Sequence, residues 1–246
     1  MVSTQLPVLW LTLRQFGAWR STRVVALFAA TPILFGLIFL LNSNNTTPDT
    51  FLGDVFNQFM APTVIPLATL ILATATLGNE LSDRTIVYLI IKPISTIRIV
   101  LEKFVGTFLV TSMAILVGLL ITWLVVVAGP GTPSGAALGS MFVGALIGVA
   151  AYGALFLFVS LIVPRALLVG VIYVLLWESL LARFIPGIRI LSVRHFVQSI
   201  FIHILGDADV KIAQSNALVS SLIVMVLLVV VSLGLAAFRL RQMNLD

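Results

Sequence analysis

Cysteine is absent from this sequence, and charged residues and histidines are scarce. Without cysteine the chain can form no disulfide, thiolate nucleophile or cysteine-ligated metal site. Charged residues make up 9% of the 246 residues, whereas soluble domains average about a quarter. A soluble chain of this length could not bury so much apolar surface, so the scarcity of charge excludes an ordinary globular protein.

Hydrophobic residues make up 60% of the chain, and the mean hydropathy is +1.18. This composition predicts residence in a lipid bilayer. The net charge of +5 is the kind of basic bias that flanks membrane spans on the cytoplasmic side. We therefore expect no nucleic-acid partner, although the isoelectric point is near 10.2.

The apolar runs are long enough for six crossings at about 20 residues each. They predict a single transmembrane domain, an all-α integral membrane protein in which residues 1–23 precede the first span and include an interfacial helix. The six predicted spans cover residues 24–41, 55–78, 104–128, 136–163, 166–181 and 217–238.

Basic residues predict the orientation of the spans. They precede the first span, occupy the 79–103 loop, lie at Arg165 and follow the last span, whereas the 42–54 and 129–135 loops contain no Lys or Arg. Both termini and the 79–103 loop are therefore expected to be cytoplasmic in a multi-pass inner-membrane protein. The outer 182–216 segment does carry basic residues, but longer loops follow the charge rule less well.

The outer 182–216 segment is too apolar for a solvated loop and too short to span. Residues 192–205 predict a short amphipathic helix with Ser192 as its N-cap and Gly206 as its break. A re-entrant or surface-lying element fits this pattern. Prolines 62 and 66 in the second span predict bends, static or hinge-like.

Small residues recur every four positions at the start of the fourth span, a spacing that lets two helix backbones approach closely. This ridge could face another span of the same chain or another subunit, and internal packing is the default. Its members are Ala136, Ser140, Gly144 and Gly148.

Motifs for catalysis, nucleotide binding and metal binding are absent. No glycine precedes a lysine as a phosphate-binding loop requires, and there is no zinc-protease or serine-hydrolase motif. His195 and His203 lie near two aspartates, but Gly206 interrupts the helix, so we expect polar surface residues and no metal site. Glu178 is the one acid within a predicted span, where either structural pairing with Arg183 or water, or a role in substrate contact or proton relay, would explain it.

The 79–103 loop is the most informative stretch. It is a charged amphipathic segment between two membrane spans, with Glu80 after the second span, Arg84-Thr85, then Lys92-Pro93-Ile94-Ser95, and Glu102-Lys103 leading into the third span. Lys92-Pro93 should end one helix and begin another, which predicts a shaped element on the cytoplasmic face.

These residues resemble the signature of the ABC-2 family, the membrane subunits of one class of ABC exporters, and the layout of the whole chain is similar. Asp83-Arg84 departs from the Gly that precedes Thr in many members. The resemblance implies a dimer of identical or related permease subunits, each carrying a soluble ABC ATPase that binds ATP and Mg, with no cofactor on this chain. It implies coupling to that ATPase through Glu80, Asp83, Arg84, Thr85, Lys92, Pro93, Ser95, Arg98 and Lys103.

The resemblance also implies a translocation path between two subunits, lined by the second and fifth spans. The polar candidates along it are Thr63, Thr69, Thr74 and Glu178. The sequence thus predicts a permease that is not itself an enzyme and that exports a hydrophobic or amphiphilic substrate by alternating access. The alternatives are a membrane enzyme that modifies lipids, and a non-transporting scaffold or sensor coupled to an ATPase.

Overall fold

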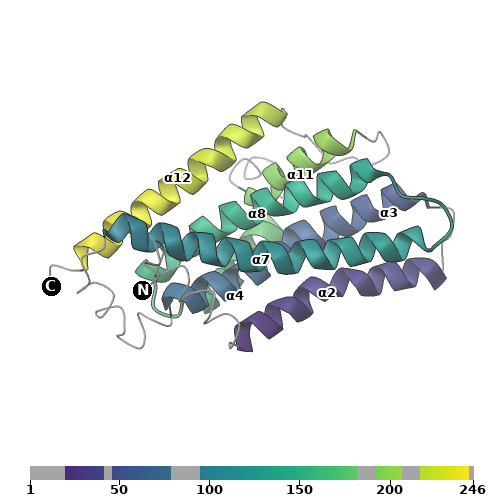
Figure 1. Cartoon of the computed structure of the whole chain (residues 1–246). Coiled ribbons are helices and arrows are strands. Elements are labelled where there is room, and N and C mark those ends of the chain that lie inside the picture. The colour runs from purple at the N-terminus through teal and green to yellow at the C-terminus, as the bar shows by residue number, and fades with distance from the viewer. Residues whose placement is uncertain (1–19, 42–45, 79–94, 182–191, 207–216, 244–246) are drawn as a thin grey trace, which may run out of the picture.

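The computed structural model describes residues 20–41, 46–78, 95–181, 192–206 and 217–243, and these residues form an elongated helical bundle with no strand among them (Figure 1). The predicted all-α membrane fold is confirmed. The elements are α2 (Arg20–Leu41), α3 (Pro48–Val55), η1 (Phe56–Val64), α4 (Ile65–Ala73), η2 (Thr74–Gly78), α7 (Thr96–Val127), α8 (Gly135–Ile162), α9 (Ala166–Ile172), η3 (Tyr173–Leu181), α11 (Val193–Leu205) and α12 (Leu218–Gln242), where η marks the wider π-helix.

Five of the helical stretches among the described residues are long and apolar enough to cross a bilayer. They lie at Ser21–Leu41, Pro48–Thr76, Thr96–Val127, Gly135–Ile162 and Leu218–Gln242. The remaining predicted span, 166–181, is helical throughout as α9 and η3, but it is shorter than the other five.

Two spans begin earlier than the apolar runs suggest. The second span was predicted from residue 55, but its helix begins at Pro48, where the Thr47 side chain accepts a hydrogen bond from the Thr50 amide. A threonine N-cap followed by proline strongly favours a helix start. The prediction missed this start because it was based only on the length of the apolar run. The third span was predicted from residue 104, but α7 begins at Thr96, so the last part of the predicted coupling segment continues directly into the membrane helix.

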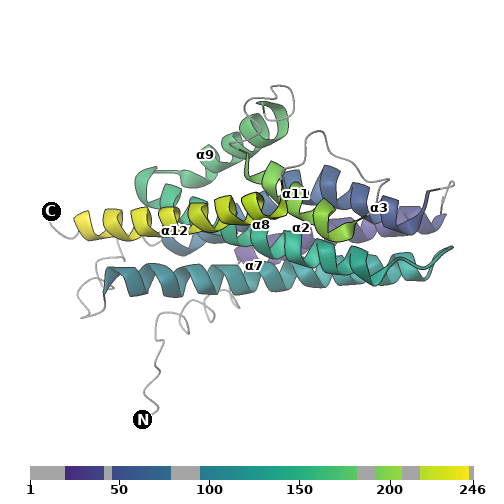
Figure 2. The same cartoon turned by 90° about the horizontal axis from the view of Figure 1, so that it is seen from above.

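Helix α8 lies at the centre of the bundle and packs against α4, α7, α11 and α12, while α2 packs against the outer side of α7 (Figures 1 and 2). Leu27 of α2 and Met113 of α7 are each 71% exposed, and most of α12 is exposed apolar surface. Exposing these apolar side chains to water would cost free energy, so this surface is suited to contact with the hydrocarbon of a bilayer.

Small residues set the closest helix contacts. A Cβ atom on Gly118 of α7 would lie 2.0 Å from the backbone oxygen of Ala29 in α2, so these two backbones touch. Gly144 of α8 lies against Phe56 and Phe201, whose rings stack with centroids 4.4 Å apart.

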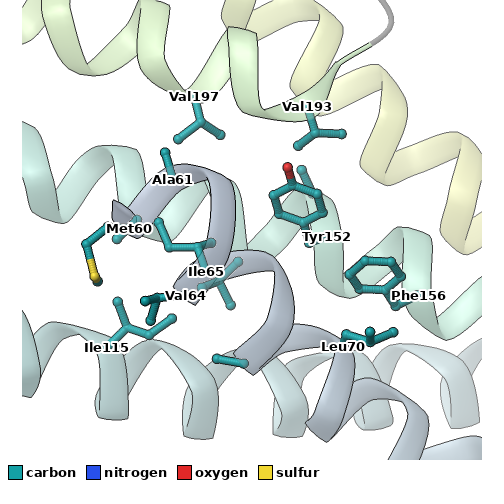
Figure 3. Close-up of a cluster of buried hydrophobic side chains, with 14 of the residues drawn as sticks. Met60, Ala61, Val64, Ile65, Leu70, Ile115, Tyr152, Phe156, Val193 and Val197 are labelled. Carbon is teal, nitrogen blue, oxygen red and sulfur yellow. The ribbon is translucent and has the colours of Figure 1, made fainter. Parts of the chain in front are cut away.

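The predicted small-residue ridge therefore faces the interior of this chain over most of its length. Gly148 packs against Ile65 of α4 and Val197 of α11, two side chains that point into the same buried cluster in Figure 3. Ser140 is fully buried, whereas Ala136 at the start of the ridge is exposed.

Helix α11 has the predicted N-cap at Ser192 and the predicted end at Gly206. Of the two predicted alternatives, re-entrant or surface-lying, its packing fits the re-entrant one. It is packed against α8 and α12, and most of its residues are buried. His195 was expected at the surface, but it is only 9% exposed. The reason is that α11 packs against Gly144 and Gly148 of α8, where the absence of side chains leaves room for a neighbouring helix.

Candidate functional site

Two clusters of polar side chains lie inside the apolar bundle, and each is centred on one buried ionisable residue. Lys103, near the start of α7, and Glu178, in η3, are both fully inaccessible to solvent. A buried charge is costly unless polar groups surround it, so the partners of these two residues indicate what each one does.

Lys103 joins the second span to the third. Its Nζ donates a hydrogen bond to the backbone oxygen of Thr76 at 3.3 Å. Thr76 lies in η2, the last described element of the second span. The contact therefore holds η2 against the start of α7.

The surrounding hydroxyls reinforce this contact. The Thr76 hydroxyl donates to the Leu72 oxygen at 2.6 Å and lies 3.1 Å from the Thr107 hydroxyl of α7. Thr76 and Thr107 are both buried. The two spans that flank the predicted coupling segment are thus connected through polar groups at its base.

The part of the predicted coupling segment that the structure describes, residues 95–103, is more exposed at its start than around Lys103. Ser95 is exposed and serves as the N-cap of α7 through its backbone, without a side-chain hydrogen bond. Arg98 forms a 2.7 Å ion pair with Glu102 one helical turn later, and its side chain is 47% exposed. The other predicted coupling residues, Glu80, Asp83, Arg84, Thr85, Lys92 and Pro93, lie outside the described residues, as does the predicted interfacial helix at 5–19.

The predicted path residues do not form one cluster. Thr69 and Thr74 are buried, and their hydroxyls donate back to the Ile65 and Leu70 oxygens of their own helix at 2.6 and 2.7 Å. Thr63 is partly buried in η1. Across the described residues, no hydrogen bond joins any of these threonines to Glu178.

Glu178 caps the start of α11. One carboxylate oxygen accepts the Val193 amide at 3.1 Å, and the other accepts the Arg194 amide at 3.4 Å. The Ser192 hydroxyl donates to the carboxylate at 2.5 Å and accepts the His195 amide at 3.3 Å. Three of the amides that a helix start leaves unpaired are therefore satisfied by this pair of side chains.

The remaining contacts of Glu178 complete its environment. The Tyr173 hydroxyl donates to the carboxylate at 3.0 Å, and the Arg194 guanidinium donates to the Glu178 backbone oxygen at 3.3 Å. A carboxylate at a helix N-terminus is also favoured by the helix dipole. This geometry favours the structural interpretation of Glu178; the predicted partner Arg183 lies outside the described residues.

Several polar residues of these clusters were not singled out from the sequence. Thr76 contacts Lys103, Thr107 contacts Thr76, and Tyr173 contacts Glu178, but each is a common residue in an apolar run. Tyr152 of α8 is fully buried, and Figure 3 shows its hydroxyl pointing towards Val193, next to the capped helix start. That hydroxyl has no hydrogen-bond partner among the described residues. In the Glu178 cluster, two residues could be identified from the sequence: Glu178, as the lone acid in a predicted span, and Ser192, as the serine before an amphipathic run.

Neither cluster presents the groups of a catalytic site. Within the described residues, no three His, Asp or Glu side chains come together in a way that could hold a metal ion. Both clusters instead join separate elements: Glu178 joins η3 to the start of α11, and Lys103 joins α7 to η2.

Comparison with known proteins gives one finding. The family model described as "ABC-2 family transporter protein" matches residues 18–181, which include the first five predicted spans, the Lys103 cluster and Glu178 itself. No curated protein matches the chain.

Proposed function

The chain belongs to the ABC-2 transporter family, and on this premise we propose that it is the permease subunit of an ATP-driven exporter. In this proposal a separate soluble ABC ATPase binds ATP and Mg and docks on the 79–103 segment. Two permease subunits, identical or related, enclose the path, and the chain itself hydrolyses no ATP. A hydrophobic or amphiphilic substrate crosses the membrane by alternating access.

The observation that carries the proposal is the Lys103 contact. The proposed docking segment joins the second span to the third, and Lys103 fixes the base of that segment to both spans through Thr76. A force applied to the segment would therefore move the two spans together instead of deforming a loose connection. This is the mechanical property that coupling to an external ATPase requires.

The distribution of charge supports the same arrangement. Arg98 and Lys103 near the start of α7 lie at the same end of the bundle as Arg239 and Arg241 at the end of α12 (Figure 1). The acidic Asp49 and Asp54 belong to α3, towards the other end. Basic residues gather on the cytoplasmic side of a membrane protein, which is the side where a soluble ATPase could bind.

The translocation path would lie at the second and fifth spans, with Thr63, Thr69 and Thr74 as the residues proposed along it. Glu178, which the sequence also predicted there, is engaged as the cap of α11. Thr69 and Thr74 are buried, so substrate contact with them would require the surrounding helices to move, which fits a path that opens during the transport cycle.

The proposal is tested by purifying the tagged full chain in mild detergent from its native cell and identifying its stoichiometric partners. We expect a soluble protein with a nucleotide-binding loop, and we expect Glu80→Ala combined with Arg84→Ala to lose it. Arg239→Ala, which removes a basic residue from a different element at the same end, is the matched control and should keep it.

A chain that folds and purifies without any ATPase would overturn the proposal. A partner retained in full by the double variant would show that the ATPase binds elsewhere, and would remove the assigned role of the 79–103 segment.

A further inference from the structure

An open groove runs between the first part of α7 and the last part of α12. Figures 1 and 2 both place the start of α7 beside the end of α12, and the groove between them holds about 660 Å³. This volume lies within the roughly 300–1,000 Å³ of small-molecule sites. The lining consists of Ser95, Thr96, Ile97, Val100, Leu101, Val230, Leu233, Gly234, Ala237, Phe238 and Arg241.

Gly234 shows that the groove is open space and not a seam between packed side chains. A Cβ atom added to Gly234 would meet no atom within 4 Å. The neighbouring walls are aliphatic or aromatic, and Phe238 on α12 and Ile97 on α7 are 60% and 61% exposed. An apolar ligand could therefore lie along α12 over Gly234 without displacing protein.

The apolar part of the groove fits within one leaflet of a bilayer. Its apolar lining on α12 extends from Val230 to Phe238, which is about 12 Å at 1.5 Å per residue, and Arg241 lies about one turn further along. The hydrocarbon core of a bilayer is about 30 Å thick, so each leaflet contributes about 15 Å. An acyl chain in the groove would thus be level with the chains of the surrounding lipid.

One end of the groove is cationic and polar. Arg241, at the end of α12, is exposed and forms no ion pair within the described part of the chain. Ser95 and Thr96 lie across from it at the start of α7. All other residues that line the groove are apolar, so charge is confined to the end where a lipid headgroup would be.

We propose that this groove binds an anionic phospholipid, with its acyl chains along Val230, Gly234 and Leu101 and its phosphate at Arg241. Apolar burial would hold the chains, and attraction to Arg241 would select an anionic headgroup over a zwitterionic one. The proposal requires only that the chain resides in a membrane. It is therefore independent of the transport function proposed above.

The test is native mass spectrometry of the full chain with equimolar dioleoyl phosphatidylglycerol and dioleoyl phosphatidylcholine. We expect preferential binding of phosphatidylglycerol. Arg241→Gln should lower that preference by about fivefold, the effect of one basic residue at an anionic lipid surface, while Arg239→Gln should leave it unchanged. Gly234→Leu should fill the groove and reduce the occupancy of both lipids.

Gly139→Leu is the matched control, because a Cβ atom on Gly139 also meets no atom within 4 Å and Gly139 lies in α8, outside the groove. The proposal is overturned if Gly234→Leu and Gly139→Leu bind lipid equally, or if both arginine variants lose the preference to the same extent. A change of oligomeric state in Gly234→Leu alone would assign the groove to a second copy and would equally overturn it.

Discussion

Glu178 and Lys103 show how single ionisable residues are accommodated in this apolar bundle. Glu178 lies at the start of α11, where its charge is favoured and its oxygens accept amides that the helix start would otherwise leave unpaired. Lys103 donates from α7 to a backbone oxygen of η2. The same contact thus satisfies the side chain and fixes two elements to each other.

Replacing Glu178 with Gln tests this role at the scale of one residue. The amide keeps the shape but loses the charge, and its NH2 group would face another donor. Because hydrogen bonds to a charged group contribute about 1.5–3 kcal/mol each, we expect a clearly lower thermal unfolding midpoint in detergent. Asp54→Asn is the control, since Asp54 is exposed and bonds only Gln58 one turn away.

Asp54→Asn should unfold like the parent protein. If Glu178→Gln kept full stability but lost transport, Glu178 would be a path residue and not a helix cap.

For single residues, the sequence identified which polar side chains matter but not which side chains they contact. A lone acid in a span and a serine before an amphipathic run are visible in the sequence, and both Glu178 and Ser192 were identified from it. That Ser192 bonds Glu178 fourteen residues earlier depends on how α11 folds back beside η3, and no local pattern encodes that return.

At the scale of elements, glycine determines how closely the helices pack. The predicted ridge of α8 was visible because its small residues repeat every four positions. Gly118 of α7 makes a closer contact, with the Ala29 backbone. Ala114 and Thr122 lie four residues before and after it, so the same small-residue spacing was present in α7 but was not singled out from the sequence. Bounds based on apolar runs also missed the start of α3 at Pro48, because that helix begins in polar sequence.

Gly118→Ala should separate α2 from α7. The added methyl group would lie 2.0 Å from a backbone oxygen, which a side-chain rotation cannot relieve. Overpacking of this kind costs about 1–3 kcal/mol, and we expect a lower unfolding midpoint by differential scanning fluorimetry.

Gly139→Ala in α8, where a Cβ atom meets open space, is the control and should leave the midpoint unchanged. Equal midpoints for the two variants would contradict the close approach of α2 and α7.

At the scale of the whole molecule, the orientation can be mapped directly because the chain contains no cysteine. Thr132 in the turn between α7 and α8 and Gln242 at the end of α12 are both exposed, and each can be replaced by a single cysteine. We expect a membrane-impermeant maleimide to label Thr132→Cys in intact cells and Gln242→Cys only after lysis. The parent protein gives the background.

The reverse labelling pattern would place the 79–103 segment outside the cytoplasm, where no ATPase could reach it. The sequence predicted the membrane class and the position of its spans because both depend on composition and run length. Substrate and subunit arrangement depend on surfaces between chains, which one sequence does not specify.

The most direct test of the account is the rate of ATP hydrolysis by the copurified ATPase, alone and with the full chain in liposomes. We predict that the chain stimulates hydrolysis and that Lys103→Met reduces the stimulation by at least about fivefold, the lower range of coupling between sites, while the ATPase stays bound. Arg239→Met should keep full stimulation. If the chain does not stimulate hydrolysis, or if Lys103→Met behaves like the parent protein, coupling through the Lys103 contact is wrong.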